Sequence, residues 1–128
     1  MQKIFLIVGA VLAGVSVALG AFGAHGLKKI VPPETVAIYQ TAVQYQMYHA
    51  LALLLLGVLS DKYFSSFIHY SGLFFLGGVI FFSGSLYLIV SILAMKKIVP
   101  TLIGIATPIG GLLFVIGWIL LLIGIIRK

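Results

Sequence analysis

The sequence predicts an all-α integral membrane protein, a bundle of four transmembrane helices. Of its 128 residues, 62% are hydrophobic and only 8% are charged, and the mean hydropathy is +1.29. A soluble domain of this length would be far less apolar. The charged residues leave four uncharged runs, at 4–27, 35–60, 63–95 and 98–126, each longer than the ~20 residues that cross a ~30 Å hydrocarbon core as a helix. Because the runs lack the alternation of barrel strands, we expect helices.

We treat residues 1–128 as one membrane domain with spans at about 4–24, 35–60, 64–93 and 101–126. The first span contains many small residues, which allow helices to approach closely in lipid, and we expect it to be retained rather than cleaved as a signal peptide. The second span follows Pro33 and Glu34, residue types that suit the first turn of a helix.

The third span becomes rich in aromatic residues and glycine at residues 74–82. In the fourth span, Pro108 predicts a kink near Gly104. Gly110, Gly117 and Gly124 recur every seven residues, a spacing that keeps one seam against a partner helix. Such glycine-rich faces also suggest a homo-oligomer.

Polar side chains concentrate in the first half of the second span, from Gln40 to His49. With four spans, the termini share one membrane face, A, and the links after the first and third spans share the opposite face, B. Most of the polar groups within the spans then lie on the B side of the midplane, and such groups are costly unless paired. We therefore predict a cleft half a membrane deep, open toward face B and floored by His49. Its candidate ligand-binding residues are Gln44, Tyr45, Tyr48, His49, Ser83, Ser85, Tyr87 and Thr107.

Four motifs occur in order along nearly the whole chain: Phe22 to Leu27 (FGAHGL), Thr41 to Ala52 (TAVQYQMYHALA), Phe82 to Tyr87 (FSGSLY), and Thr107 to Gly111 (TPIGG) with Gly117-Trp118. In these motifs the chain resembles the family called domain of unknown function 423, small four-span membrane proteins of the YgdD and YwdK type. The resemblance implies a bacterial inner-membrane protein. It implies no activity and no catalytic residues.

His49 has two interpretations. As a functional group it would bind a ligand, relay a proton or hold a cofactor; as a structural group it would be a neutral imidazole bonded to Tyr45, Ser83 or Ser85. A haem would need a second His49 from another copy or a weaker sixth ligand, and we predict no cofactor. The three histidines lie at different depths, so no metal site is predicted. A Ser–His pair would lack an orienting acid, so an enzyme is not favoured.

The net charge of +6 comes from short clusters at helix ends, a pattern that faces lipid headgroups rather than nucleic acid. Positive residues tie at four on each face: Lys3, Lys62, Arg127 and Lys128 on face A against Lys28, Lys29, Lys96 and Lys97 on face B. We expect cytoplasmic termini. The favoured hypothesis is binding or translocation of a small polar molecule, ion or lipid headgroup. The alternatives are an assembly protein, whose polar groups only specify packing, and a haem or quinone redox subunit.

Overall fold

The computed structural model describes residues 2–127; Lys128, counted above on face A, lies outside the described residues. The elements are α1 (Lys3–His25), a 3₁₀ turn η1 (Leu27–Lys29), α2 (Pro33–Leu59), α3 (Ser66–Gly78), a π-helical turn η2 (Val79–Ser83), α4 (Gly84–Ala94) and α5 (Thr101–Ile126). With 66–94 taken as one span, four helices are long and apolar enough to cross a membrane. The predicted all-α, four-helix transmembrane fold is therefore confirmed.

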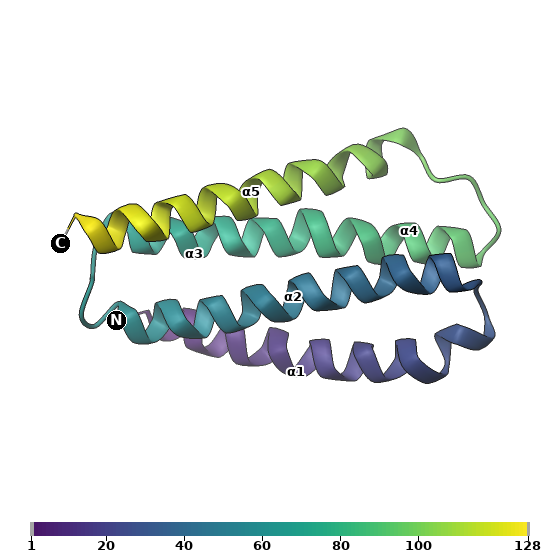
Figure 1. The fold of residues 1–128 in the computed structure, drawn as a ribbon, viewed down its shortest axis with the longest axis horizontal. Helices are drawn as coiled ribbons and strands as arrows, with labels where there is room; N and C mark the ends of the chain where they lie inside the picture. The colour runs from purple at the N-terminus through teal and green to yellow at the C-terminus, as the bar shows by residue number, and fades with distance from the viewer. Residues whose placement is uncertain (1, 128) are drawn as a thin grey trace.

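The spans run side by side, and the two ends of the chain lie at the same end of the bundle (Figure 1). Helix α1 packs on α2, and α5 packs on α3 and η2. Helix α2 also contacts α3, η2 and α4, and so joins the two pairs. From this central position, polar side chains of α2 bond to all three other spans: Gln46 to α1 and α4, and His49 to α5.

Proline, serine and lysine mark the helix ends. Pro33 occupies the first position of α2, where its missing N–H has no intrahelical partner to lose. The Ser65 side chain caps α3 by accepting the N–H of Ile68 at 3.3 Å. Lys96 has a φ of 57° just after α4, which turns the chain toward α5. With the helices ending at these residues, η1 and the link between α4 and α5 both lie at the face-B end of the bundle (Figure 1).

The heptad-spaced glycines of α5 pack within the chain. A Cβ on Gly110 would overlap the backbone nitrogen of Phe82, and one on Gly117 would lie 2.7 Å from the Phe75 ring. A Cβ on Gly124 would lie 2.9 Å from the Ile68 side chain. The predicted seam therefore exists, and its partner is the 66–94 span of the same chain.

The sequence predicted one regular helix for the third span, but the structure shows a helix with an interruption. The π-helical turn η2 lies where Gly110 brings α5 onto the backbone of Phe82, and the Ser83 hydroxyl there donates to the carbonyl of Ala42 on α2 at 2.8 Å. A π turn inserts one extra residue into a helix and shifts the facing of the residues after it. The interruption therefore coincides with contacts to α2 and α5. Such contacts are not encoded in any local sequence pattern.

Candidate functional site

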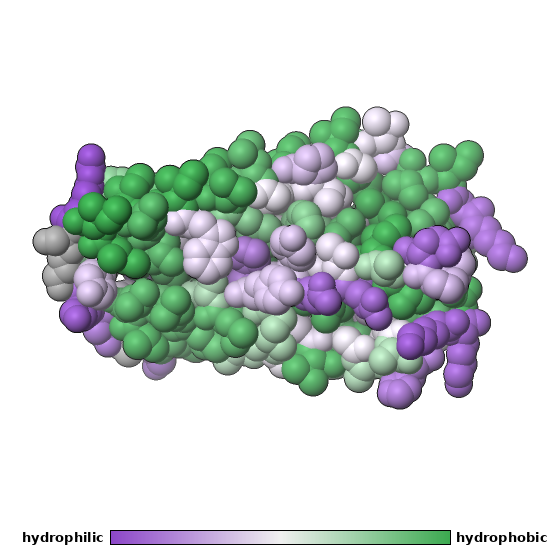
Figure 2. All heavy atoms as spheres, in the orientation of Figure 1, coloured by the Kyte–Doolittle hydropathy of each residue, from purple (hydrophilic) through white to green (hydrophobic). Residues whose placement is uncertain are grey.

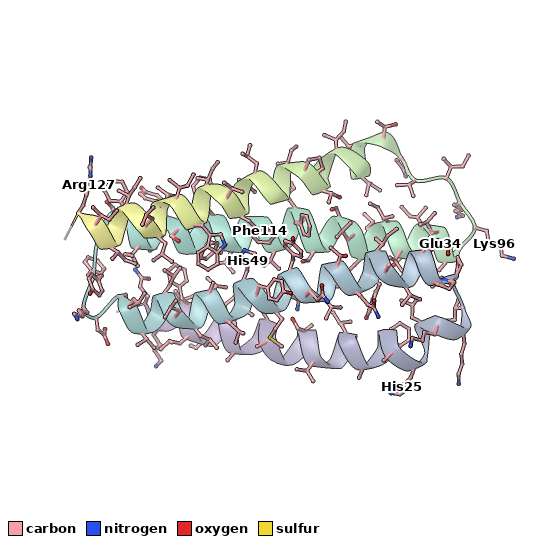
Figure 3. The ribbon with its side chains drawn as sticks, in the orientation of Figure 1. His25, Glu34, His49, Lys96, Phe114 and Arg127 are labelled. Carbon is pink, nitrogen blue, oxygen red and sulfur yellow. The ribbon has the colours of Figure 1, made fainter. Side chains whose placement is uncertain are left out.

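His49 lies in an aromatic cage between α2 and the α3–α5 pair (Figure 3). The side chain is only 4% exposed. Its ring stacks on Phe114 with centroids 3.5 Å apart and planes 10° apart, and Phe75 meets it edge-on at 5.3 Å. The residue is therefore a packed part of the interior rather than the floor of an open cleft.

Both ring nitrogens of His49 have partners. Trp118 Nε1 lies 3.1 Å from His49 Nε2, and because indole can only donate, Nε2 must accept. The proton of the neutral ring is then on Nδ1, which donates to the carbonyl of Tyr45 at 2.7 Å. A haem iron or other ligand would have to displace one of these bonds.

Of the three partners that the sequence suggested for His49, the structure has Tyr45, through its backbone carbonyl, and neither serine. The ring binds the backbone of Tyr45, and its second partner is Trp118 on α5. Ser83 and Ser85 were the other expected partners, but Ser83 donates to Ala42 and Ser85 lies 2.6 Å from the hydroxyl of Thr107. The Ser–His pair that hydrolytic chemistry would need is thus not formed.

Gln46 is the polar centre that sequence reasoning did not select. It is 3% exposed; its amide nitrogen donates to the carbonyl of Leu12 on α1 at 3.0 Å, and its amide oxygen accepts from the Tyr87 hydroxyl on α4 at 2.7 Å. The row Ala42, Gln46, Ala50, with small residues on either side of the amide, is the signal that predicts this buried face. Gln46 therefore ties together three helices.

The remaining polar side chains of the interior are also satisfied. Tyr39 donates to the carbonyl of Leu19 on α1 at 2.6 Å, and Ser71 donates to the carbonyl of Gly117 on α5 at 2.8 Å. Among residues 2–127, no buried side-chain nitrogen or oxygen lacks a hydrogen-bond partner. The interior of this part of the chain is thus a complete hydrogen-bond network.

A second set of polar residues on α2 faces outward. Gln40, Gln44 and Tyr48 lie four residues apart and are exposed, Tyr48 by 54%; we call them the α2 polar row. Within residues 2–127 their side chains make no hydrogen bond. Figure 2 shows pale and purple atoms that cross an otherwise largely green face from its middle toward the face-B end. At 1.5 Å per residue, Gln44 lies about 3 Å and Gln40 about 9 Å from the middle of α2, within the ~15 Å half-thickness of the hydrocarbon.

The eight candidate residues thus fall into different environments. His49, Ser83 and Ser85 are buried, Tyr87 and Thr107 are half-buried, and Gln44, Tyr45 and Tyr48 are exposed. On a helical projection at 100° per residue, Gln44, Tyr48 and Tyr45 fall in one arc whose centre lies about 135° from the centre of the buried face of α2. A surface hollow of about 240 Å³ adjoins the α2 polar row and is lined by Gly20, Tyr39, Gln40, Val43 and Gln44.

Comparison with known proteins gives a consistent family and no activity. A family model described as "Protein of unknown function (DUF423)" matches residues 19–111. A UPF0382 membrane protein of Staphylococcus aureus is 46% identical, over 95% of this chain and 94% of its own length. The UPF0382 membrane protein YwdK of Bacillus subtilis is 40% identical over 98% of each chain. No solved structure matches.

Proposed function

Because this chain belongs to the family of unknown function DUF423, whose name carries no activity, we propose a function from its geometry: it is a membrane assembly module that self-associates through the α2 polar row. The observation that carries the proposal is that Gln40 and Gln44 are exposed at membrane depth and have no partner among residues 2–127. Lipid tails have no hydrogen-bonding groups for a carboxamide. An amide left unpaired in hydrocarbon raises the free energy by several kcal/mol.

The shape of the α2 polar row favours a helix as its partner. Gln40, Gln44 and Tyr48 follow one face of α2 over about 12 Å. Small-molecule sites are concave, whereas the face of a helix is convex and matches another helix. Polar side chains on such faces hold transmembrane helices together by interhelical hydrogen bonds.

A second copy of the chain is the occupant with matching chemistry. A carboxamide carries both donors and an acceptor, so two identical amides can pair with each other. Copies inserted in the same orientation present Gln44 at the same depth, and a two-fold axis along the membrane normal brings the two rows together. The row contains no charged residue that would oppose this pairing.

Native mass spectrometry of the protein released from native-lipid nanodiscs tests the proposal. We expect the wild type to be a dimer and the double variant Gln40→Leu/Gln44→Leu to be a folded monomer. The control Leu112→Ala/Ile119→Ala alters exposed residues of α5, on a different helix from the row, and should stay dimeric. A wild-type monomer, or a different protein bound in place of the second copy, would contradict self-association.

A second candidate function, binding of a small polar molecule or lipid headgroup, is favoured by the hollow beside Gln40 and Gln44. A ligand there would enter sideways from the bilayer. The same measurement distinguishes it: a reproducible small added mass, lost in Gln44→Leu and retained in His49→Ala, would establish ligand binding at the hollow. A bare chain or bare dimer would exclude it.

The proposed location is the bacterial inner membrane, with both termini in the cytoplasm. The two ends of the chain lie at the same end of the bundle (Figure 1), so a single reporter decides their side. A fluorescent protein that matures only in the cytoplasm, fused after residue 128, should fluoresce. Alkaline phosphatase at the same position should be inactive, and the reverse pair of results would place the termini outside.

A further inference from the structure

A groove on the bundle surface lies between α1 with η1 on one side and α4 on the other. It has a volume of about 380 Å³, within the range of about 300–1,000 Å³ typical of ligand sites. Its walls include Leu19, Phe22, Leu27, Ile30, Tyr87 and Val90. Because both walls pack on α2, the floor is fixed and the groove opens toward the lipid.

The groove offers no free hydrogen-bonding side chain to an occupant. The Tyr39 hydroxyl in its floor is committed to Leu19, and the Tyr87 hydroxyl to Gln46. The third polar side chain of the lining, Ser91, donates to the carbonyl of Tyr87. The two tyrosine rings meet edge-on at 5.6 Å and present carbon to the groove. The matching occupant is therefore a hydrocarbon chain, whose contacts fill space that would otherwise lack them.

Four lysines follow or interrupt the groove lining in the sequence at face B, although the Lys28 side chain also lines a separate hollow with Val31, Pro33, Val36 and Gln40. Lys28 and Lys29 lie between the lining residues Leu27 and Ile30, and Lys96 and Lys97 follow the lining residue Ala94. None of the four ammonium groups forms an ion pair within residues 2–127. Glu34 is the one carboxylate near this end, and Figure 3 shows it at the same end as Lys96.

We propose that this groove is a binding site for an anionic phospholipid, with one acyl chain along the groove and the phosphate between the two lysine pairs. Hydrocarbon is equally stable in bulk lipid and in an apolar groove, so the groove positions the lipid and the lysines select its charge. Each lysine near an anionic headgroup contributes about 1 kcal/mol, or about fivefold in affinity. The groove shares Tyr39 with the hollow beside the α2 polar row, but neither its lining nor the four lysines include a residue of that row.

The test uses the full chain in nanodiscs of phosphatidylcholine mixed with phosphatidylglycerol, and counts the lipids retained on release into a mass spectrometer. We expect the wild type to retain phosphatidylglycerol at least about fivefold over its share of the bilayer. The variant Lys28→Gln/Lys29→Gln/Lys96→Gln/Lys97→Gln should lose this preference. The matched control Lys3→Gln/Lys62→Gln/Arg127→Gln/Lys128→Gln removes as much charge from face A and should keep it.

A groove-filling variant separates the acyl chain from the headgroup. Ala94 lines the groove, and Ala94→Trp should abolish retention while leaving all four lysines in place. Far-ultraviolet circular dichroism confirms that each variant is folded. Equal retention of the two lipids by the wild type, equal loss in the face-A control, or full retention by Ala94→Trp would each overturn the proposal.

Discussion

Gln44 and Gln46 lie two residues apart on α2 and have opposite surroundings. Gln46 is buried and bonded to α1 and α4 through both ends of its amide, whereas Gln44 is exposed and makes no hydrogen bond within residues 2–127. The same side chain thus fixes the bundle in one position and is free to recruit a partner in the other. Polarity in a transmembrane helix therefore indicates a partner, and only the packing shows whether that partner is internal.

A pair of glycines and a pair of histidines show the same contrast between an interior and an exposed position. Gly110 lies against the backbone of Phe82, while a Cβ on Gly104 would meet nothing within 4 Å. His49 is caged by aromatic rings, while His25 is exposed at face B (Figure 3). These matched pairs supply each interior variant with a control of the same residue type.

The glycine pair should give the largest difference. Gly110→Leu would place side-chain atoms where the Phe82 backbone lies, so α5 must move away from η2. We expect the free energy of unfolding to fall by about 4 kcal/mol or more, or folding to fail. Gly104→Leu should leave the melting temperature in detergent nearly unchanged. Equal melting of the two variants would show that α5 does not pack as described.

The histidine pair comes next. His49→Ala removes the ring that stacks on Phe114 and leaves the Trp118 N–H without its acceptor. We expect a loss of about 2–5 kcal/mol, the range for truncating a large core side chain to alanine. His25→Ala should change stability by no more than about 0.5 kcal/mol. Thermal unfolding in the same detergent measures both, and an unchanged His49→Ala protein would argue that the cage contributes no stability.

The glutamine pair sharpens the contrast most directly. Gln46→Leu leaves the Tyr87 hydroxyl without its acceptor and removes the bond to the Leu12 carbonyl, which keeps the Ser16 hydroxyl as a donor. We expect destabilisation by about 1–3 kcal/mol. Gln44→Leu should leave the melting temperature of the monomer unchanged and weaken the dimer. Melting curves combined with native mass spectrometry separate these effects. If Gln44→Leu destabilises the monomer as much as Gln46→Leu, the inside–outside distinction is wrong.

The serine pair should give the smallest effect. Ser83→Ala removes one bond between η2 and α2, and such interhelical bonds average about 0.6 kcal/mol in membranes. Ser91 is exposed and bonds only the carbonyl four residues earlier in its own helix, so Ser91→Ala should be neutral. Denaturation in mixed micelles resolves this difference if both variants are measured together. If Ser83→Ala does not change stability, the hydrogen bond from Ser83 on η2 to α2 does not stabilise the bundle.

Much of the fold was predictable because it depends on local composition. Uncharged runs longer than the hydrocarbon core predict spanning helices whatever their neighbours, and the seven-residue glycine spacing predicted a packed seam. The rotation of α2 was not predictable in the same way. Polar residues from Gln40 to His49 cover about 240° of the helix circumference, so helical periodicity alone does not say which part of that arc faces the interior.

The candidate site was predicted only in part for the same reason. The sequence identified His49 as a central residue, and its neighbours on α2 share its helix but not its environment. Its partner Trp118 lies 69 residues away, and no spacing rule connects residues at that separation. The interior network and the outward row could be separated only after the four spans had been packed.

The sequence by itself determined that this chain crosses a membrane four times, because burial in hydrocarbon depends on the length and apolarity of each segment. Tertiary structure alone decided which polar groups are satisfied and which remain for partners. The reason is geometric: a hydrogen bond needs two groups within about 3 Å, and here Gly110, Ala42 and Gln46 bring the helices close enough to form some of these bonds, while Gln40 and Gln44 are turned toward the lipid.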